Sequence, residues 1–208
     1  MILPRFNIDP GDGSVVAVAV GAFLATISGF VATQIEHFNR RRDNERSAAL
    51  LFGEVLVGIR FALQLADETR GRGDPYGPIT MRMIRAAQRE TQTYDRNRES
   101  LFDLRDPHIR AQIHILLTRL ILALDGVTET TREIASTETA MRLRGLADDS
   151  YKDLAVLRDS YFQDRKRSFD FTVELKSEIG PLLEKLQRIT KYSFDSHEAV
   201  MRESVASR

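Results

Sequence analysis

The chain has 208 residues, of which 42% are hydrophobic and 29% charged, so it has enough apolar material for a packed core and is not expected to be globally disordered. Lys and Arg together number 30, as do Asp and Glu, and this balance predicts no bulk attraction to nucleic acid. The absence of cysteine excludes disulfides, thiolate zinc sites, iron–sulfur clusters and cysteine nucleophiles, while abundant Arg, Leu, Ala and Glu favour helix.

The first distinctive feature is an uncharged stretch that follows a short tail, residues 1–13. From Ser14 to Ile35 no side chain is charged, and Asp12 and Glu36 bound the stretch. As an α-helix it would be about 33 Å long, against a hydrocarbon core of about 30 Å. The pattern therefore predicts a transmembrane helix over 14–35. A cleaved signal peptide would have a shorter apolar run, and a buried core helix, the other alternative, seldom runs this far without a charged face.

Arginines flank this stretch unequally. Arg40, Arg41, Arg42 and Arg46 follow it, whereas only Arg5 precedes it. Flanking basic residues are retained on the cytoplasmic side, so we expect the N-terminus outside and the rest of the chain inside. We also expect the four following arginines to lie among anionic lipid headgroups.

Small residues recur at every fourth position of the predicted span. They are Ala17, Gly21, Ala25, Gly29 and Thr33. A line of small residues on one helix face lets another helix approach closely, so this face is predicted to pack against a second membrane helix. The alternative is that membrane helices are simply rich in Gly and Ala.

Residues 36–194 are predicted to form a cytoplasmic, antiparallel helical bundle. Apolar positions spaced three to four apart follow the anchor: Ala48, Leu51, Val55, Ile59, Ala62 and Ala66, widened by Phe52, Leu56 and Leu63. The loop GRGDPYGP at 71–78 ends this helix, and a second helix is expected from Ile79 to about Arg98.

The next predicted helix is the most apolar and the most buried of the domain. Asp106 is expected to cap it, with Pro107 at its first position. Its apolar positions are Ile109, Ile113, Leu116, Leu117, Leu120, Ile121, Leu124 and Val127. Because Arg110, His114 and Arg119 interrupt the run, it is not expected to be a second span. Thr128–Thr139 reads as an exposed turn or a loose helical continuation.

A further helix is predicted from Asp148 to about Ile179, where Gly180-Pro181 should break or kink it. A 4-3-4-3 apolar spacing nevertheless continues across this dipeptide: Leu175, Ile179, Leu182, Leu186 and Ile189. Such a short seam is typical of a bundle helix rather than an extended coiled coil. The polar segment 195–208 is predicted to be a flexible tail.

No catalytic or phosphate-binding motif is present, and we expect no catalytic residue, cofactor or metal. His108 and His114 are six residues apart, which does not place them together on a helix face, so the histidines are interpreted as surface or boundary residues. The segments YDRNR and RDSYFQDRKR are interpreted as solvated helix faces with i,i+4 ion pairs rather than as phosphate- or RNA-binding sites.

The order of features resembles a group of uncharacterised bacterial membrane proteins with one N-terminal span. The similarity rests on the basic stretch Asn39–Arg42, a helix like Ser47–Leu65, the segment Tyr94–Leu101 with its Tyr-x-x-Asn-x-x-x-Leu pattern, and an apolar helix like Ile109–Leu124. It covers residues 14–125. The resemblance implies a bacterial inner membrane location and supplies no activity.

These observations favour a membrane-anchored, non-enzymatic helical module. The expected partners are membrane lipid and either another protein or a second copy of the chain, with no nucleic acid. The alternative is a regulatory component that relays a signal through the span, although the outer tail is too short for a folded sensor domain. An enzyme with unrecognised residues ranks third.

Overall fold

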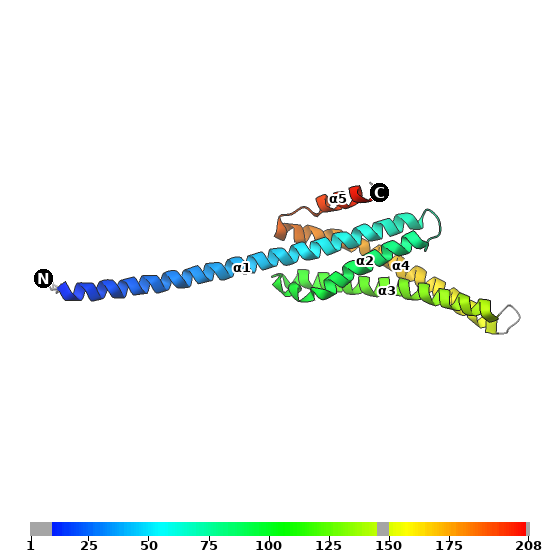
Figure 1. Cartoon of the computed structure of the whole chain (residues 1–208), viewed down its shortest axis with the longest axis horizontal. Coiled ribbons are helices and arrows are strands. Elements are labelled where there is room, and N and C mark those ends of the chain that lie inside the picture. Colours follow the sequence, from blue (N-terminus) through cyan, green and yellow to red (C-terminus); the bar gives the residue numbers. More distant parts are fainter. Residues whose placement is uncertain (1–9, 145–149, 207–208) are drawn as a thin grey trace. The chain divides into compact units, whose positions relative to one another are not determined.

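A computed structural model describes residues 10–144 and 150–206, and every secondary-structure element in these ranges is helical (Figure 1). The predicted all-α class is therefore confirmed. The elements are α1 (Pro10–Arg70), α2 (Pro78–Arg96), the 3₁₀ helix η1 (Arg98–Asp103), α3 (Pro107–Arg144), α4 (Ser150–Thr190) and α5 (Phe194–Ala206).

The chain divides into two compact units within α1. The first ends at Asn44 and the second begins at Glu45, nine residues beyond the predicted domain start at 36. Every core residue that the structure describes lies in the second unit.

The second half of α1 is more deeply buried than α3, so the prediction that α3 is the most buried helix is wrong. Of the predicted apolar positions, all are buried except Leu51, which is half-buried. Ala49, Val57 and Gly58, which lie outside the predicted stripe, are buried as well. A narrow line of positions that includes Ser47, Glu54 and Glu68 is exposed, so this part of α1 is covered on most of its sides.

Helices α2 and α3 follow their predicted patterns closely. Helix α2 buries a single face, including Ile84, Ala87 and Tyr94. At the start of α3, the Asp106 carboxylate accepts a hydrogen bond from the His108 backbone N–H at 2.8 Å, which confirms the predicted cap. The middle of α3 buries the predicted apolar positions, apart from Ile121, which is half-buried and packs against the core.

The threonine-rich stretch 128–139 is helical and lies within α3. It is therefore a continuation of the helix and not an exposed turn. Its hydroxyl groups donate to carbonyl oxygens four residues earlier. Thr130 donates to Gly126 at 2.6 Å, and Thr131 donates to Val127 at 2.7 Å. These bonds satisfy the hydroxyls inside a helix, which removes their usual preference for turns.

Helix α4 continues through Gly180-Pro181, so the predicted break is absent. The apolar seam explains the difference, because Leu175, Ile179, Leu182 and Leu186 are buried on both sides of the proline and Ile189 packs against the core. Helix α4 lies beside α3, and α3 also packs against α2 (Figure 1). Residues 148–149, the predicted start of this helix, lie outside the described residues.

The C-terminal segment also differs from its prediction. In place of a flexible tail from residue 195, the structure has helix α5 as far as Ala206. The residue that starts this helix, Phe194, is 1% exposed and belongs to the core. The tail prediction considered only polar residues after 194, and it therefore missed the aromatic side chain that holds the helix in place.

Candidate protein-binding groove

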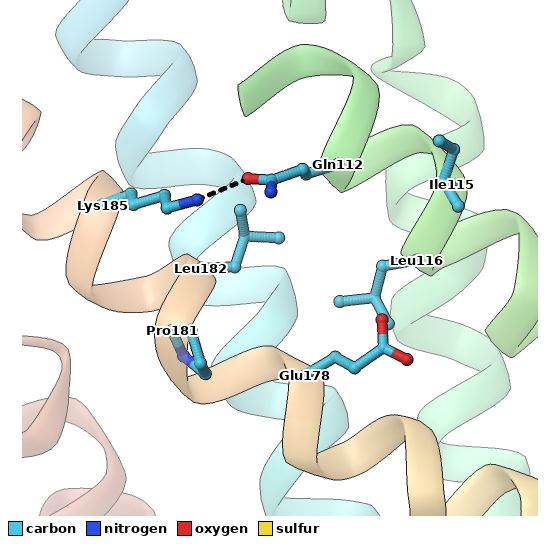
Figure 2. Close-up of a pocket in the computed structure, with 7 residues that line it drawn as sticks. All are labelled: Gln112, Ile115, Leu116, Glu178, Pro181, Leu182 and Lys185. Atoms are coloured by element: carbon cyan, nitrogen blue, oxygen red, sulfur yellow. Dashed lines mark hydrogen bonds between the residues drawn. The ribbon is translucent and has the colours of Figure 1, made fainter. Parts of the chain in front are cut away.

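A groove of about 290 Å³ lies between α3 and α4 on the second unit (Figure 2). Two helices position its walls: α3 contributes three residues and α4 contributes four. They are Gln112, Ile115, Leu116, Glu178, Pro181, Leu182 and Lys185.

The floor and rim of this groove differ in exposure. Leu116 and Leu182 form the floor and are almost fully buried, whereas Ile115 on the rim is 56% exposed. Leu122 lies seven residues beyond Ile115, on the same face of α3, and is 68% exposed. Thr118 and Arg119 lie between Ile115 and Leu122 on this face, so the exposed apolar surface is interrupted there.

Two polar links join the walls. The Lys185 ammonium donates to the Gln112 side-chain oxygen at 2.8 Å, as drawn in Figure 2. Farther along, Arg119 donates to both carboxylate oxygens of Glu178, at 2.8 and 3.1 Å, and stacks 5.3 Å from the ring centre of Phe171. Arg119 and Glu178 are partly exposed, so their pair contributes more to wall spacing than to stability.

This arrangement suits the packing of an apolar side chain. The apolar floor can contact an apolar side chain, and the polar groups at the edges can fix its orientation. Binding pockets usually combine these two features. The Glu178 charge is already matched by Arg119, so the groove presents Lys185 as its main remaining charge.

A buried arginine forms a second unusual feature, which sequence reasoning missed. Arg165 is 9% exposed, and its guanidinium lies 3.8 Å from the ring centre of Tyr76 and 5.1 Å from that of Phe162. Neither Arg165 Nε nor the Tyr76 hydroxyl has a hydrogen-bond partner among the described residues. Burial lowers the pKa of Arg165, although the nearby Tyr76 and Asp74 oppose this shift.

The segment RDSYFQDRKR was predicted to be a solvated helix face, and this prediction is wrong at Arg165, which is buried. Among the neighbouring residues, Lys166 pairs with Asp170 at 3.8 Å in the expected i,i+4 spacing, and Arg167 pairs with Asp164, three residues away, at 3.5 Å. Arg165 lies on the opposite side of the helix and enters an aromatic site. The sequence signal was the group of aromatic residues around this arginine, which allows cation–π stacking.

The predicted headgroup arginines have different surroundings. Arg40, Arg41 and Arg42 are exposed, and Arg40 pairs with Glu36 at 3.2 Å. Arg46 belongs to the second unit, where its Nε donates to the Thr190 carbonyl oxygen at 3.1 Å. Arg46 thus caps the C-terminal end of α4, a favourable place for a cation.

The predicted membrane packing face is only partly described. Helix α1 includes all five positions, but the side chains of Ala17, Gly21, Ala25 and Gly29 lie outside the described residues. Thr33, the last of the set, is exposed.

Among the residues whose side chains the structure describes, two helical segments are long and apolar enough to cross a membrane, by length and composition alone. They are Thr33–Arg70 of α1 and Pro107–Leu143 of α3. Most of the apolar window in the first is buried inside the structure, which is also how the core helix of a soluble protein behaves. These helices make the chain compatible with a membrane and leave its topology undetermined.

The histidines that the structure describes lie at the surface or at its boundary. His108 is exposed, and its Nε2 lies 3.2 Å from the side-chain nitrogen of Gln112. His114 is half-buried, with its Nδ1 2.7 Å from the hydroxyl of the buried Tyr94 and its Nε2 3.3 Å from Arg98. The His114 ring therefore links α2 and α3.

No family model matches the chain, and neither a curated protein nor a solved structure is detectably similar to it. The resemblance to single-span bacterial membrane proteins stays a prediction.

Proposed function

We propose that the chain is a membrane-anchored, non-enzymatic helical module that binds a partner protein or assembles with itself. The uncharged stretch 14–35 carries this proposal. Within it, Phe23 and Phe30 are seven residues apart on one face of α1 and are 67% and 65% exposed. Large aromatic side chains left uncovered by protein are best accommodated by lipid.

The proposed topology has one span, with the N-terminus outside and the main unit in the cytoplasm of a bacterial cell. The excess of arginine after the span supports this orientation, and the exposure of Arg41 and Arg42 leaves them able to reach headgroups. The other apolar helix, α3, is better explained as a core helix. In lipid, the Arg119 and Glu178 charges beside it would face hydrocarbon at a high cost.

The proposed cytoplasmic domain is an antiparallel bundle. Its support is the order of contacts between α3 and α4: Gln112 meets Lys185, Arg119 meets Glu178, and Gly126 approaches Ser168. Residue numbers rise along one helix as they fall along the other. The groove between these helices is the proposed place for an apolar side chain of a partner.

Charged substitutions in the anchor test the proposal. The double variant Phe23→Arg and Phe30→Arg should move the full-length chain from carbonate-washed membranes to the soluble fraction, because two charges at mid-span are costly in lipid. Ile79→Arg is the matched control, since Ile79 is 62% exposed but lies in the second unit. A wild-type chain that is soluble without detergent would contradict the membrane assignment.

The same preparations test self-association through the small-residue face. Replacing Gly21, Ala25 and Gly29 by leucine should weaken association in a membrane dimerisation assay, because bulky residues keep the helices apart. An unchanged signal would remove this face as the means of assembly.

A signal-relaying role is the second candidate. One observation favours it: α1 extends without interruption from Pro10 to Arg70 and therefore links the apolar stretch to the core by a single helix.

A further inference from the structure

Helix α5 is attached to α1 through an aromatic side chain seated on a glycine. The Phe194 ring lies so close to Gly53 that a Cβ at that position would overlap it. Tyr192 packs edge-on against Phe194, with the ring centres 5.6 Å apart and the planes at 77°. The start of α5 therefore occupies a notch in α1 that a larger residue would fill.

A group of charged and polar side chains extends this attachment along both helices. Arg60 pairs with Glu198 and lies 3.7 Å from Asp195. Arg202 donates to the Glu198 carboxylate at 2.8 Å and to the Gln64 side-chain oxygen at 3.1 Å. The Glu198 and Arg60 side chains at the centre of this network are 12% and 21% exposed, whereas Arg202 and Asp195 at its edge are 55% and 86% exposed. We call residues 53–64 of α1 the α5 seat.

The connection between α4 and α5 is short and has an unfavourable backbone conformation. It consists of residues 191–193, and Lys191 has a φ of 57°, in the left-handed region that residues with a Cβ rarely adopt. The Lys191 N–H still donates to the Gln187 carbonyl oxygen at 2.8 Å, as in a helix. A right-handed φ at Lys191 would therefore extend α4 and carry α5 away from its own seat.

We propose that two copies of the chain exchange α5, each placing this helix on the α5 seat of the other. The exchange reuses the contacts that Phe194 and Glu198 make with α1, and the main change lies at the hinge, where the left-handed lysine conformation is lost. Short hinges under strain favour such exchange, and it produces a closed, two-fold dimer. Anchoring in a membrane would raise the local concentration of copies and so promote exchange.

This inference rests on the self-assembly part of the proposed function and names its partner as a second copy. A second copy fits the seat better than an unrelated protein does. The seat is matched at three levels by α5 itself: Phe194 against Gly53, Glu198 against Arg60, and Arg202 against Gln64. A different partner would need an aromatic, an acid and a base in the same helical spacing.

The absence of native cysteine allows a direct test with the full-length chain in membranes. One copy carries Gln64→Cys and a differently tagged copy carries Arg202→Cys, and the two are co-expressed and treated with a short bismaleimide. Exchange predicts a cross-linked heterodimer. A single chain with both substitutions should also cross-link as a dimer. If that chain cross-links only within the monomer and the mixed copies give no product, exchange is ruled out.

Two further variants separate seating from random collision and test the hinge. Adding Phe194→Ala to the Arg202→Cys copy should remove most of the heterodimer, and an undiminished product would show collision and overturn the proposal. Lys191→Gly should lower the heterodimer yield severalfold, because glycine adopts the left-handed conformation without strain and so favours the closed form. An unchanged yield would remove hinge strain as the cause.

The cross-linking results distinguish a failure of the α5 exchange proposal from a failure of the proposed function. Cross-linking confined to one copy, together with a positive anchor dimerisation assay, would overturn exchange alone. A heterodimer recovered from a chain that is soluble without detergent would support exchange and contradict the membrane assignment.

Discussion

Single residues decide how closely the helices of the second unit approach one another. Gly53 is the clearest case, because the ring of Phe194 occupies the space of its missing side chain. Gly126 is another, since a Cβ there would lie 2.7 Å from the Ser168 hydroxyl oxygen. At both positions the sequence shows only a glycine inside an apolar helix, and the reason for it is a contact with a distant segment.

Gly53→Ala should therefore destabilise the second unit by about 1–3 kcal/mol, the usual range for an overpacked core. The Phe194 ring must move, and α5 should lose protection in hydrogen exchange before the remaining helices do. Gly73→Ala is the matched control, because a Cβ at Gly73 would meet no atom of the described residues within 4 Å, apart from its chain neighbours. Equal effects of the two substitutions on denaturant unfolding would contradict this account.

For Tyr76, in contrast to Gly53, we expect that one substitution does not lower the stability of the second unit. Its hydroxyl is buried without a hydrogen-bond partner among the described residues, and burial raises its pKa although the Arg70 and Arg165 charges oppose this. Tyr76→Phe removes the unsatisfied group and keeps the ring over Arg165, so it should leave stability unchanged or raise it by up to about 1 kcal/mol. Tyr76→Ala should instead be strongly destabilising in urea unfolding, and a costly Tyr76→Phe would point to an unseen partner.

At the scale of whole elements, α5 is the helix whose attachment depends most on charge. Burial alone would raise the pKa of Glu198, but the Arg202 hydrogen bond and the Arg60 charge outweigh burial and lower it below its ordinary value of 4.5. A carboxyl group with a lowered pKa in the folded state stabilises that state above its ordinary pKa. This contribution disappears as the pH falls through the lowered pKa.

Acid should therefore release α5 selectively. We expect the protection of α5 against hydrogen exchange, relative to the intrinsic rate at each pH, to be constant near neutral pH and to fall progressively below pH 4.5 as Glu198 takes up a proton. Asp195, which also faces Arg60, should contribute less because its side chain is 86% exposed. In the Glu198→Gln variant, the α5 amides should have low protection against hydrogen exchange at every pH. If their protection fell with acid as steeply as in the wild type, a group other than Glu198 would be responsible for the pH dependence.

The elements also show where sequence reasoning succeeds. Periodicity identified the buried faces of α2 and α3, and local chemistry identified the cap at Asp106, because both depend on neighbours in sequence. The continuation of α4 through Pro181 and the existence of α5 depend on tertiary packing. The groove was not predicted, since it requires knowing that residues near 115 and 182 come together.

At the scale of the whole molecule, the division at Asn44 separates an apolar stretch from a unit that contains its own core. The helix α3 is apolar enough to count as a candidate span, but its buried side chains pack against the same core as α1. The two explanations of α3, as a core helix or as a second span, predict different behaviour when the N-terminal unit is removed.

Residues 45–208 expressed alone should be soluble without detergent and should unfold cooperatively, because they contain all the buried core residues in the described part of the chain. The full chain should require detergent. Ultracentrifugation and thermal unfolding monitored by circular dichroism provide the measurement. A fragment that pellets with membranes would favour a second span in α3 and would contradict the single-span topology.

The glycine notch also restricts how α1 can move. Ala49 and Val57 lie about one helical turn before and after Gly53. Both are fully buried, and both have a Cβ atom. A slide of α1 by one turn, about 5.4 Å, would bring one of these residues beneath the Phe194 ring, where there is no room for it. A one-turn step of α1 is therefore blocked while α5 is in place, and an input that requires such a step must first dislodge α5.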